Sequence, residues 1–459
     1  MLNQDVALQA IAEALKTGGD FAEVFLEDRI NNTLSMLSGR VEGVNSRRLH
    51  GAGIRVFSGV QGYYVYTNDT PPAGLMACAK RAASAVAGGA QIRAAAFSPA
   101  EAKNIHIIRE MPDRVQARRK AEKMKAAQTV LKEFPEVTQA RIGYNDSVQR
   151  VWIANSEGLF TADTRVYTRF MVAAIASNGT ENQTGFTGPG GMRGFEIFDG
   201  QIDPEAVAKE AAEQAVTMLH APQCPAGMMP VVIDNGFGGV IFHEACGHSL
   251  EATSVAIGNS EMCGKLGQKV AADCVTAIDD GTIPNEWGSL NIDDEGTPTT
   301  KLVLIENGIL RNYMIDKLNA RRMNMPITGS SRRQGYMFAP TSRMRNTYIA
   351  AGNDDNDEII ATMGDGLYAR KMGGGSVEPT TGKFNFAVAE GYLVKDGKIV
   401  HPVRGASLIG RGSQILPKID RVGKDMQMAQ GMCGSASGSI PTNVGQPMIR
   451  VSEMTVGGR

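Results

Sequence analysis

The chain has 459 residues, more than one ordinary hydrophobic core supports, so we expect two domains. Its 42% hydrophobic and 21% charged residues are typical of a folded globular protein, and its net charge of −1 argues against a general affinity for nucleic acid or acidic membranes. Six cysteines are too few for a disulfide framework, and the sequence shows neither a signal peptide nor an apolar run of about 18 residues, so we expect a cytoplasmic protein with no membrane partner.

The sequence of residues 1–221 predicts an N-terminal domain of helices and strands (α/β in the broad sense, here α+β), in which helices cover one face of a mixed sheet. Helices are predicted from apolar residues at helical spacing or from capping residues, over 6–16, 70–87, 115–134 and 203–219. Strands are predicted from alternating apolar and β-branched residues, over 21–26, 33–37, 51–66 with a break at Ser58-Gly59, 141–160 and 164–177. Two prolines and a glycine just after residue 221 then predict a domain boundary near residue 222.

Residues 222–459 predict a β-rich, barrel- or sandwich-like domain that carries one irregular helix near its start. Strands are predicted over 229–233, 300–306, 308–314, 347–350, 358–362, 366–371, 384–394 and 398–407. Asp396-Gly397 is typical of a hairpin turn between the last two strands. The acidic run 354–357 predicts a solvated turn.

The irregular helix is predicted from the segment His243-Glu244-Ala245-Cys246-Gly247-His248, which follows an apolar stretch. Two neutral imidazoles and one carboxylate are the parts of a hydrolytic zinc site, with the acid taking a proton from water rather than binding the metal. The histidines are five residues apart, so on a regular helix, at roughly 100° per residue, they diverge by about 140°. We therefore expect a π-bulge or a helix end at this point, eased by Gly247.

Spacing alone leaves several questions about this motif open. The two histidines can flank a glutamate by chance, because the chain contains only six histidines. Cys246 is either a third ligand or a small core residue. Cys433, in Gly431-Met432-Cys433-Gly434, is an alternative third ligand, because a thiolate binds zinc well and flanking glycines allow close backbone approach.

The chain resembles the TldD-type peptidases of the TldD/PmbA family over nearly its full length. The matching stretches are His243–Ala252, Asp293–Thr297, Leu304–Leu310, Gly373–Gly375, Cys433-Gly434 and Val444–Pro447. The resemblance implies a zinc ion held by His243, His248 and Cys433, with Glu244 as the general base. The related PmbA/TldE branch shares the fold but lacks these metal residues. One departure is visible, because Ser435–Ser439 stands where some members carry a lysine- and glutamine-bearing loop.

The resemblance also implies how substrate and partner bind. An unfolded or short peptide would add as a β-strand with low side-chain selectivity, and a dimer would form with a second copy or a PmbA-like subunit. Gly373–Gly375 is interpreted either as the edge that receives this strand or as a simple turn. The pairs Arg332-Arg333 and Arg343–Arg345 are candidates to bind a peptide carboxylate or carbonyl, with solvation as the alternative. Asp293–Glu295 lacks calcium-loop spacing and predicts a loop or a role behind the metal ligands.

Three functional classes compete with a zinc peptidase. A non-catalytic assembly subunit of the same fold would lack stoichiometric zinc, and the complete set of candidate ligands argues against it. A zinc amidohydrolase would cleave small acylated substrates rather than peptides. Nucleic-acid binding is disfavoured by the charge balance and the lack of a basic stripe.

Overall fold

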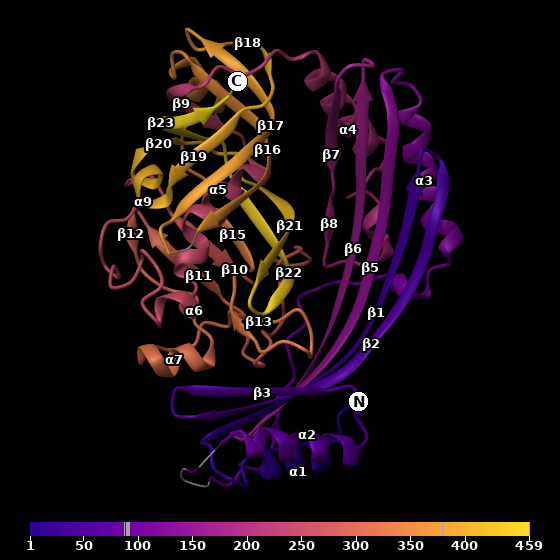
Figure 1. Cartoon of the computed structure of the whole chain (residues 1–459), viewed down its shortest axis with the longest axis vertical. Helices are drawn as coiled ribbons and strands as arrows, with labels where there is room; N and C mark the ends of the chain where they lie inside the picture. The colour runs from indigo at the N-terminus through magenta and orange to yellow at the C-terminus, as the bar shows by residue number, and fades with distance from the viewer. Residues whose placement is uncertain (87, 89–91, 379, 459) are drawn as a thin grey trace.

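The computed structural model describes residues 1–86, 88, 92–378 and 380–458. The N-terminal part holds a large sheet, two helices before residue 90 and two more beyond it (Figure 1). Its helices are α1 (Gln4–Ala14), α2 (Pro72–Ser84), α3 (Ala117–Leu131) and α4 (Pro204–His220), with 3-10 turns at Pro112–Arg114 and Phe195–Phe198. Its strands are β1 (Phe21–Leu37), β2 (Arg40–Ser58), β3 (Gln61–Thr67), β4 (Ser98–Pro99), β5 (Val137–Asn155), β6 (Leu159–Ser177), β7 (Asn182–Thr187) and β8 (Gly190–Gly191).

Four long strands form the body of this sheet. They are ordered β2-β1-β5-β6, all pair antiparallel, and contain 17 to 19 residues each. β3 pairs with β2, β7 and β8 pair with β6, and the short β4 runs parallel to β6, so the sheet is mixed. The strands curve along one side of the molecule and the C-terminal part lies in their concave side (Figure 1).

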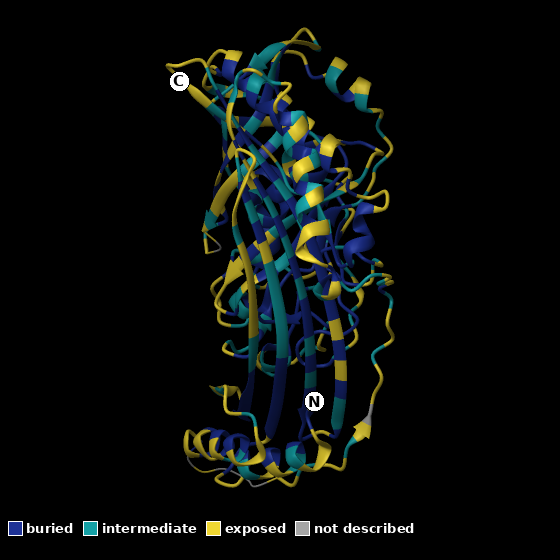
Figure 2. Ribbon diagram, turned by 90° about the vertical axis from the view of Figure 1, so that its right-hand side faces the viewer, coloured by how far each residue is buried: buried dark blue, intermediate teal, exposed yellow. Residues whose placement is uncertain are grey.

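All four helices cover one face of the sheet, as predicted. Successive side chains of a strand point to opposite faces, and Val24 and Met36 of β1 therefore share a face. Val24 packs in the cluster formed with α1 and α2, whereas Met36 packs in the cluster formed with α3 and α4. Helices α1 and α2 alternate buried and exposed residues accordingly (Figure 2).

The opposite face of the sheet contacts the C-terminal part through buried ion pairs. Glu23 of β1 pairs with Arg333 at 2.8 Å. Arg55 of β2 pairs with Glu295 and Arg165 of β6 pairs with Asp294, both at 2.7 Å. A charge that loses its partner in such a buried position is costly, so these pairs fix how the two parts sit against each other.

The C-terminal part contains a closed barrel and a second sheet. The barrel strands are β16 (Gly366–Glu378), β9 (Gly227–Ile233), β23 (Ile449–Gly457), β19 (Ser407–Arg411) and β17 (Lys383–Lys395), and pairing of β16 with β17 closes it. β18 (Lys398–Val403) and β20 (Ile419–Val422) extend it. The second sheet is ordered β12 (Ile309–Leu310), β11 (Lys301–Glu306), β10 (Ala277–Asp280), β15 (Asn346–Ile349), β22 (Gly438–Gln446) and β21 (Gln427–Ser435).

The remaining elements of this part are short. β13 (Ser331–Arg332) pairs with β14 (Thr341–Ser342). The helices are α5 (Val240–Phe242), α6 (Ala252–Val255), α7 (Lys317–Met323), α8 (Asn356–Ala361) and α9 (Gly412–Ile415), with 3-10 turns at Gly236–Gly239, His248–Leu250 and Leu416–Lys418. Among the residues described, no helix combines the length and apolar character that crossing a membrane requires.

The predicted fold class is confirmed, with local corrections. The strand predicted at 358–362 is wrong, because Asp355 caps helix α8 by accepting from the N–H groups of Asp357 and Glu358. The acidic run 354–357 is therefore a helix start rather than a turn. Residues 21–37 form one strand instead of two. The range 398–407 contains the whole of β18 and the first residue of β19, and only Ile309–Leu310 of 308–314 is strand. The predicted helix end at Ala87 lies outside the described residues.

Candidate metal centre

The motif that carries both histidines is an irregular helix, as predicted. Strand β9 leads through a 3-10 turn and α5 into a π-helix over His243–Gly247, which continues as a 3-10 turn from His248. The wider π-turn brings the two imidazole rings to 5.0 Å between centroids. A Cβ at Gly247 would lie 2.3 Å from the Met344 sulfur, so this position needs glycine for close approach, whereas its backbone is ordinary right-handed helix with φ −52° and ψ −52°.

Cys433 meets both histidines although it lies far away in the sequence. Its Sγ is 3.3 Å from Nε2 of His243 and 3.3 Å from Nε2 of His248. The three ligand atoms all lie within 4.8 Å of one another. Tetrahedral zinc with ordinary Zn–S and Zn–N bonds separates sulfur from nitrogen by about 3.5 Å. The donor set and its spacing therefore fit one zinc ion with an open fourth position.

The sulfur of Cys433 lies on the hairpin formed by β21 and β22. Cys433 is paired with Ile440 across the hairpin, and both side chains are buried. β22 in turn pairs parallel with β15 and lies against the start of the metal helix, where a Cβ at Gly239 would come within 2.5 Å of the Gly445 backbone. The approach of the hairpin to the metal helix thus depends on close packing of main chains. The spacing of residues in the sequence does not predict such packing.

Glu244 borders the same point. Its Oε2 lies 3.7 Å from Nε2 of His248, and its side chain keeps 20% of its exposure while the three ligand side chains are more enclosed. The carboxylate therefore lies beside the three candidate ligand atoms without being one of them. A carboxylate so placed can accept a proton.

A buried glutamate and a buried arginine support the ligands. Glu251 Oε2 lies 3.2 Å from Nδ1 of His248, which orients the ring so that Nε2 faces Cys433. Arg343 donates to the Cys433 carbonyl at 2.6 Å and its Nε lies 3.6 Å from Glu251 Oε1. One guanidinium therefore ties the backbone of the cysteine to the carboxylate behind the histidine. Sequence reasoning missed both roles, although Glu251 follows His248 by one helical turn.

The surroundings of Cys433 and His248 shift the pKa values of both side chains. Burial opposes ionisation of Cys433, but the two imidazoles outweigh it and hold the pKa of the thiol well below its usual range. Burial likewise opposes protonation of His248, but Glu251 and Cys433 raise its pKa well above 6.5. Both shifts favour the charged forms, a thiolate at Cys433 and an imidazolium at His248, and a divalent cation bound there would compete with the imidazolium proton.

The other sequence candidates lie elsewhere. Cys246 is fully buried in the hydrophobic cluster around the metal helix, and burial raises the pKa of its thiol, so it is the core residue of the two alternatives. Asp293 accepts from the N–H groups of Glu295, Thr297 and Ser331, and so shapes its own loop. Neither contacts the three converging ligand atoms.

The glycine-rich segment lines a cavity near the hairpin. Gly373–Gly375 lies inside β16, where pairing with β17 is interrupted between Met372 and Gly375, so the interpretation as a simple turn is wrong. Gly373 and Gly374 line a cavity of about 790 Å³, whose wall also includes residues 427–432 of β21. Strand β21, which carries Cys433, thus forms one side of this cavity.

Known proteins match the chain over most of its length. Family models described as PmbA/TldA metallopeptidase domain 1, central domain and C-terminal domain match residues 22–86, 110–219 and 226–458. A "Metalloprotease TldD homolog" of Haemophilus influenzae is 36% identical over 96% of this chain and 93% of its own length. A "Zinc metalloprotease TldD homolog" of Saccharolobus solfataricus is 29% identical over 58% of each chain.

Two crystal structures share the fold at low sequence identity. A Thermotoga maritima protein superposes with a TM-score of 0.82 at 20% identity and covers 99% of both chains. TldE from Thermococcus kodakarensis superposes with a TM-score of 0.78 at 17% identity and covers 99% of this chain and all of its own. With three family models in chain order and a full-length relative, the chain belongs to the TldD/PmbA family of metallopeptidases.

Proposed function

We propose that this chain is a zinc-dependent peptidase that hydrolyses unfolded or short peptides with little side-chain selectivity. The observation that carries the proposal is the convergence of His243, His248 and Cys433 beside the carboxylate of Glu244. The name of the Saccharolobus relative agrees with zinc as the metal. We also propose that the chain divides into two domains near residue 222, with these residues in the second domain.

The roles of the side chains follow from their positions. Zinc at such a site lowers the pKa of water to about 7 and polarises a carbonyl group. Glu244 accepts the proton of the attacking water at its carboxylate and returns it to the leaving amine. Glu251 holds the ring of His248 and Arg343 holds the backbone of Cys433, so both act as positioning residues.

The peptide is proposed to bind as an added strand in the cavity beside β21. β21 is the edge strand of its sheet and carries Cys433 near its end, and Gly373 and Gly374 of β16 border the same cavity. The carbonyl groups of Gln430 and Gly431 already accept from Arg169 and Trp287. Pairing is therefore proposed through the remaining backbone groups, which read no side chains.

The partner and compartment are also proposals. The likeness to a protein named TldE supports a dimer with a second copy or with a TldE/PmbA-like subunit. The six cysteines, all free, agree with a cytoplasmic location. A zinc amidohydrolase is the second candidate, and a screen of unstructured peptides against small acylated amides separates the two.

The test of the proposed mechanism is Glu244→Gln. We expect one zinc per chain to remain bound while peptide turnover falls by about 10²- to 10⁴-fold. Glu453→Gln, which changes an exposed carboxylate that pairs with Lys418, is the matched control. Turnover at the wild-type rate in the Glu244 variant would refute the assignment of the base.

A further inference from the structure

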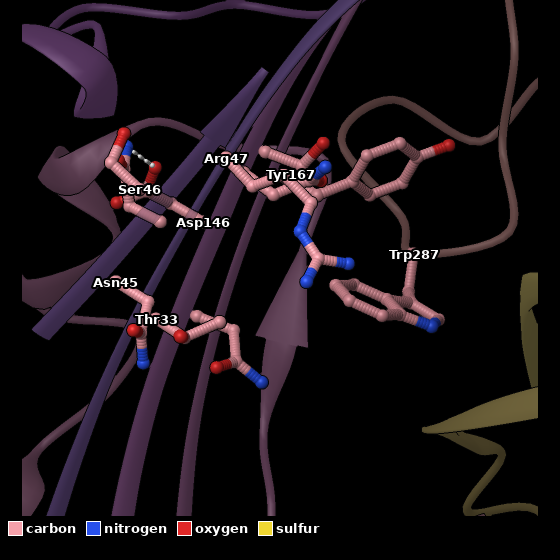
Figure 3. A pocket seen from close by; sticks show the side chains of 11 residues that line it. Thr33, Asn45, Ser46, Arg47, Asp146, Tyr167 and Trp287 are labelled. Atoms are coloured by element: carbon pink, nitrogen blue, oxygen red, sulfur yellow. Dashed lines mark hydrogen bonds between the residues drawn. The ribbon is translucent and has the colours of Figure 1, made fainter. Parts of the chain in front are cut away.

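Two adjoining cavities separate the N-terminal sheet from the C-terminal part. The larger measures about 800 Å³ and the smaller about 180 Å³. Asn31, Ser147, Tyr167 and Trp287 line both, so the two cavities share a wall. Figure 3 shows polar side chains of the long strands, including Arg47, entering the larger part beside Tyr167 and Trp287.

The smaller cavity is rich in arginine. Four guanidinium groups line it, and three of them have carboxylate partners: Arg29 with Glu27 at 3.2 Å, Arg165 with Asp294 at 2.7 Å, and Arg333 with Glu23 at 2.8 Å. Asp294 is the one carboxylate among the described lining residues, and it is occupied by Arg165 and the backbone N–H of Arg333.

Arg332, the fourth, has no ion pair within the described chain. Its side chain is buried, with 3% of the residue exposed, and its hydrogen bond goes from NH1 to the carbonyl oxygen of Met344 at 2.8 Å. Burial lowers the pKa of Arg332 to about 10; Tyr167 and Asp294 act in the opposite direction, while Arg343 and Arg165 add to the lowering. At Arg165, by contrast, Asp294 and Asp163 together outweigh burial and raise the pKa. Arg332 is therefore a buried cation that forms no ion pair with a described carboxylate, an arrangement that is costly without an anion.

Arg332 is linked to the candidate metal centre through residues next to it. Met344, whose carbonyl accepts from Arg332, is the residue whose sulfur lies against Gly247 of the metal helix. Ile440, the cross-strand partner of Cys433, lines the smaller cavity together with Met432. Met432 also lines the cavity beside β21 in which the peptide is proposed to bind, so the two cavities share a wall residue next to Cys433.

We propose that Arg332 binds a carboxylate group of the peptide substrate in the smaller cavity. This inference rests on the proposed function, because it assigns a substrate group to the same site. Guanidinium matches carboxylate geometry with two parallel hydrogen bonds, and the volume admits a terminal residue or a short acidic side chain. Arg332 would thus give a preference for peptides that present a carboxylate to a site whose strand pairing does not depend on side chains.

The carboxylate can come from the peptide C-terminus or from an aspartate or glutamate side chain. Three unstructured peptides of equal length, each with a fluorescent label at the N-terminus, separate these sources. One carries a free C-terminal carboxylate, one a C-terminal amide, and one an amide with a single internal glutamate. Fluorescence anisotropy measures their binding to the full-length, zinc-loaded Glu244→Gln protein, which holds substrate without cleaving it.

We expect at least one carboxylate-bearing peptide to bind about 10- to 100-fold more tightly than the neutral amide, the range for hydrogen bonds to charged groups. Adding Arg332→Met should abolish this difference while leaving the affinity for the neutral amide unchanged. The matched control is Arg47→Met, which removes an exposed guanidinium that lines the larger cavity. It should keep the difference.

Several outcomes would overturn the inference. Equal binding of all three peptides does so, as does a preference that survives Arg332→Met or disappears with Arg47→Met. Thermal unfolding checks the fold, and Arg332→Lys keeps the charge if the methionine variant unfolds. Should neither variant fold, the guanidinium is a requirement of the fold and the inference fails. Turnover of the neutral amide by the unmutated enzyme is measured separately, so that loss of the carboxylate preference is distinguishable from failure of the proposed peptidase.

Discussion

Replacing Glu251 with glutamine tests how the fold holds a metal ligand. The buried Glu251 carboxylate lies 3.2 Å from Nδ1 of His248 and 3.6 Å from Nε of Arg343. The amide keeps the shape and an oxygen that can accept, but it removes the charge. Loss of such a partner behind a metal-binding histidine lowers metal affinity by about 10- to 100-fold, or about 1.4 to 2.7 kcal/mol.

The assay is competition for zinc with a chromophoric chelator at pH 7.5, on wild type, Glu251→Gln and the exposed control Glu453→Gln. We expect the control to match wild type. The loss should be larger for Glu251→Ala, because alanine also removes the oxygen that can accept a hydrogen bond from Nδ1 of His248. If Glu251→Gln folds normally and binds zinc as tightly as wild type, the proposed support of His248 is refuted.

Three further predictions concern packing, protonation and the unused cysteine. Gly247→Ala should cost about 1–3 kcal/mol of stability and weaken zinc binding, since the new Cβ meets the Met344 sulfur; unchanged chemical denaturation would contradict this. His106 is buried and accepts from the N–H of Asn285, and burial lowers its pKa to about 4. The free energy of unfolding should therefore fall by about 3 kcal/mol as the pH drops from about 6.5 to below 4. His106→Gln should remove this part of the pH dependence in thermal unfolding. Cys246→Ala should retain one zinc per chain by elemental analysis, and loss of zinc would return Cys246 to the ligand set.

Local sequence signals predicted the structure where local geometry decides it. The five-residue spacing of His243 and His248 correctly predicted an irregular helix, because a regular helix would point the rings apart. The alternating residues of the long strands predicted the sheet and its helix-covered face. The segment 358–362 was misread because Ile359 and Ile360 suggest a strand, whereas the deciding feature is the capping carboxylate of Asp355.

Residue spacing and secondary-structure propensity could not predict contacts between segments that are distant in the sequence. Cys433 entered as a ligand through family resemblance, since its approach to the histidines depends on the pairing of β22 with β15. The arginines looked alike in sequence, yet Arg345 pairs with Asp279 and Arg333 with Glu23, while Arg332 is left with a carbonyl. Such differences arise only once the sheet and the C-terminal part meet.

The most direct test of the account is the zinc content of the purified protein beside its Cys433→Ser variant, measured by elemental analysis after dialysis against a weak chelator. The account predicts one zinc per wild-type chain and substoichiometric zinc in the variant, with both proteins folded. A wild-type chain without zinc, or a serine variant that keeps a full equivalent, would contradict the three-residue metal centre on which the proposed chemistry depends.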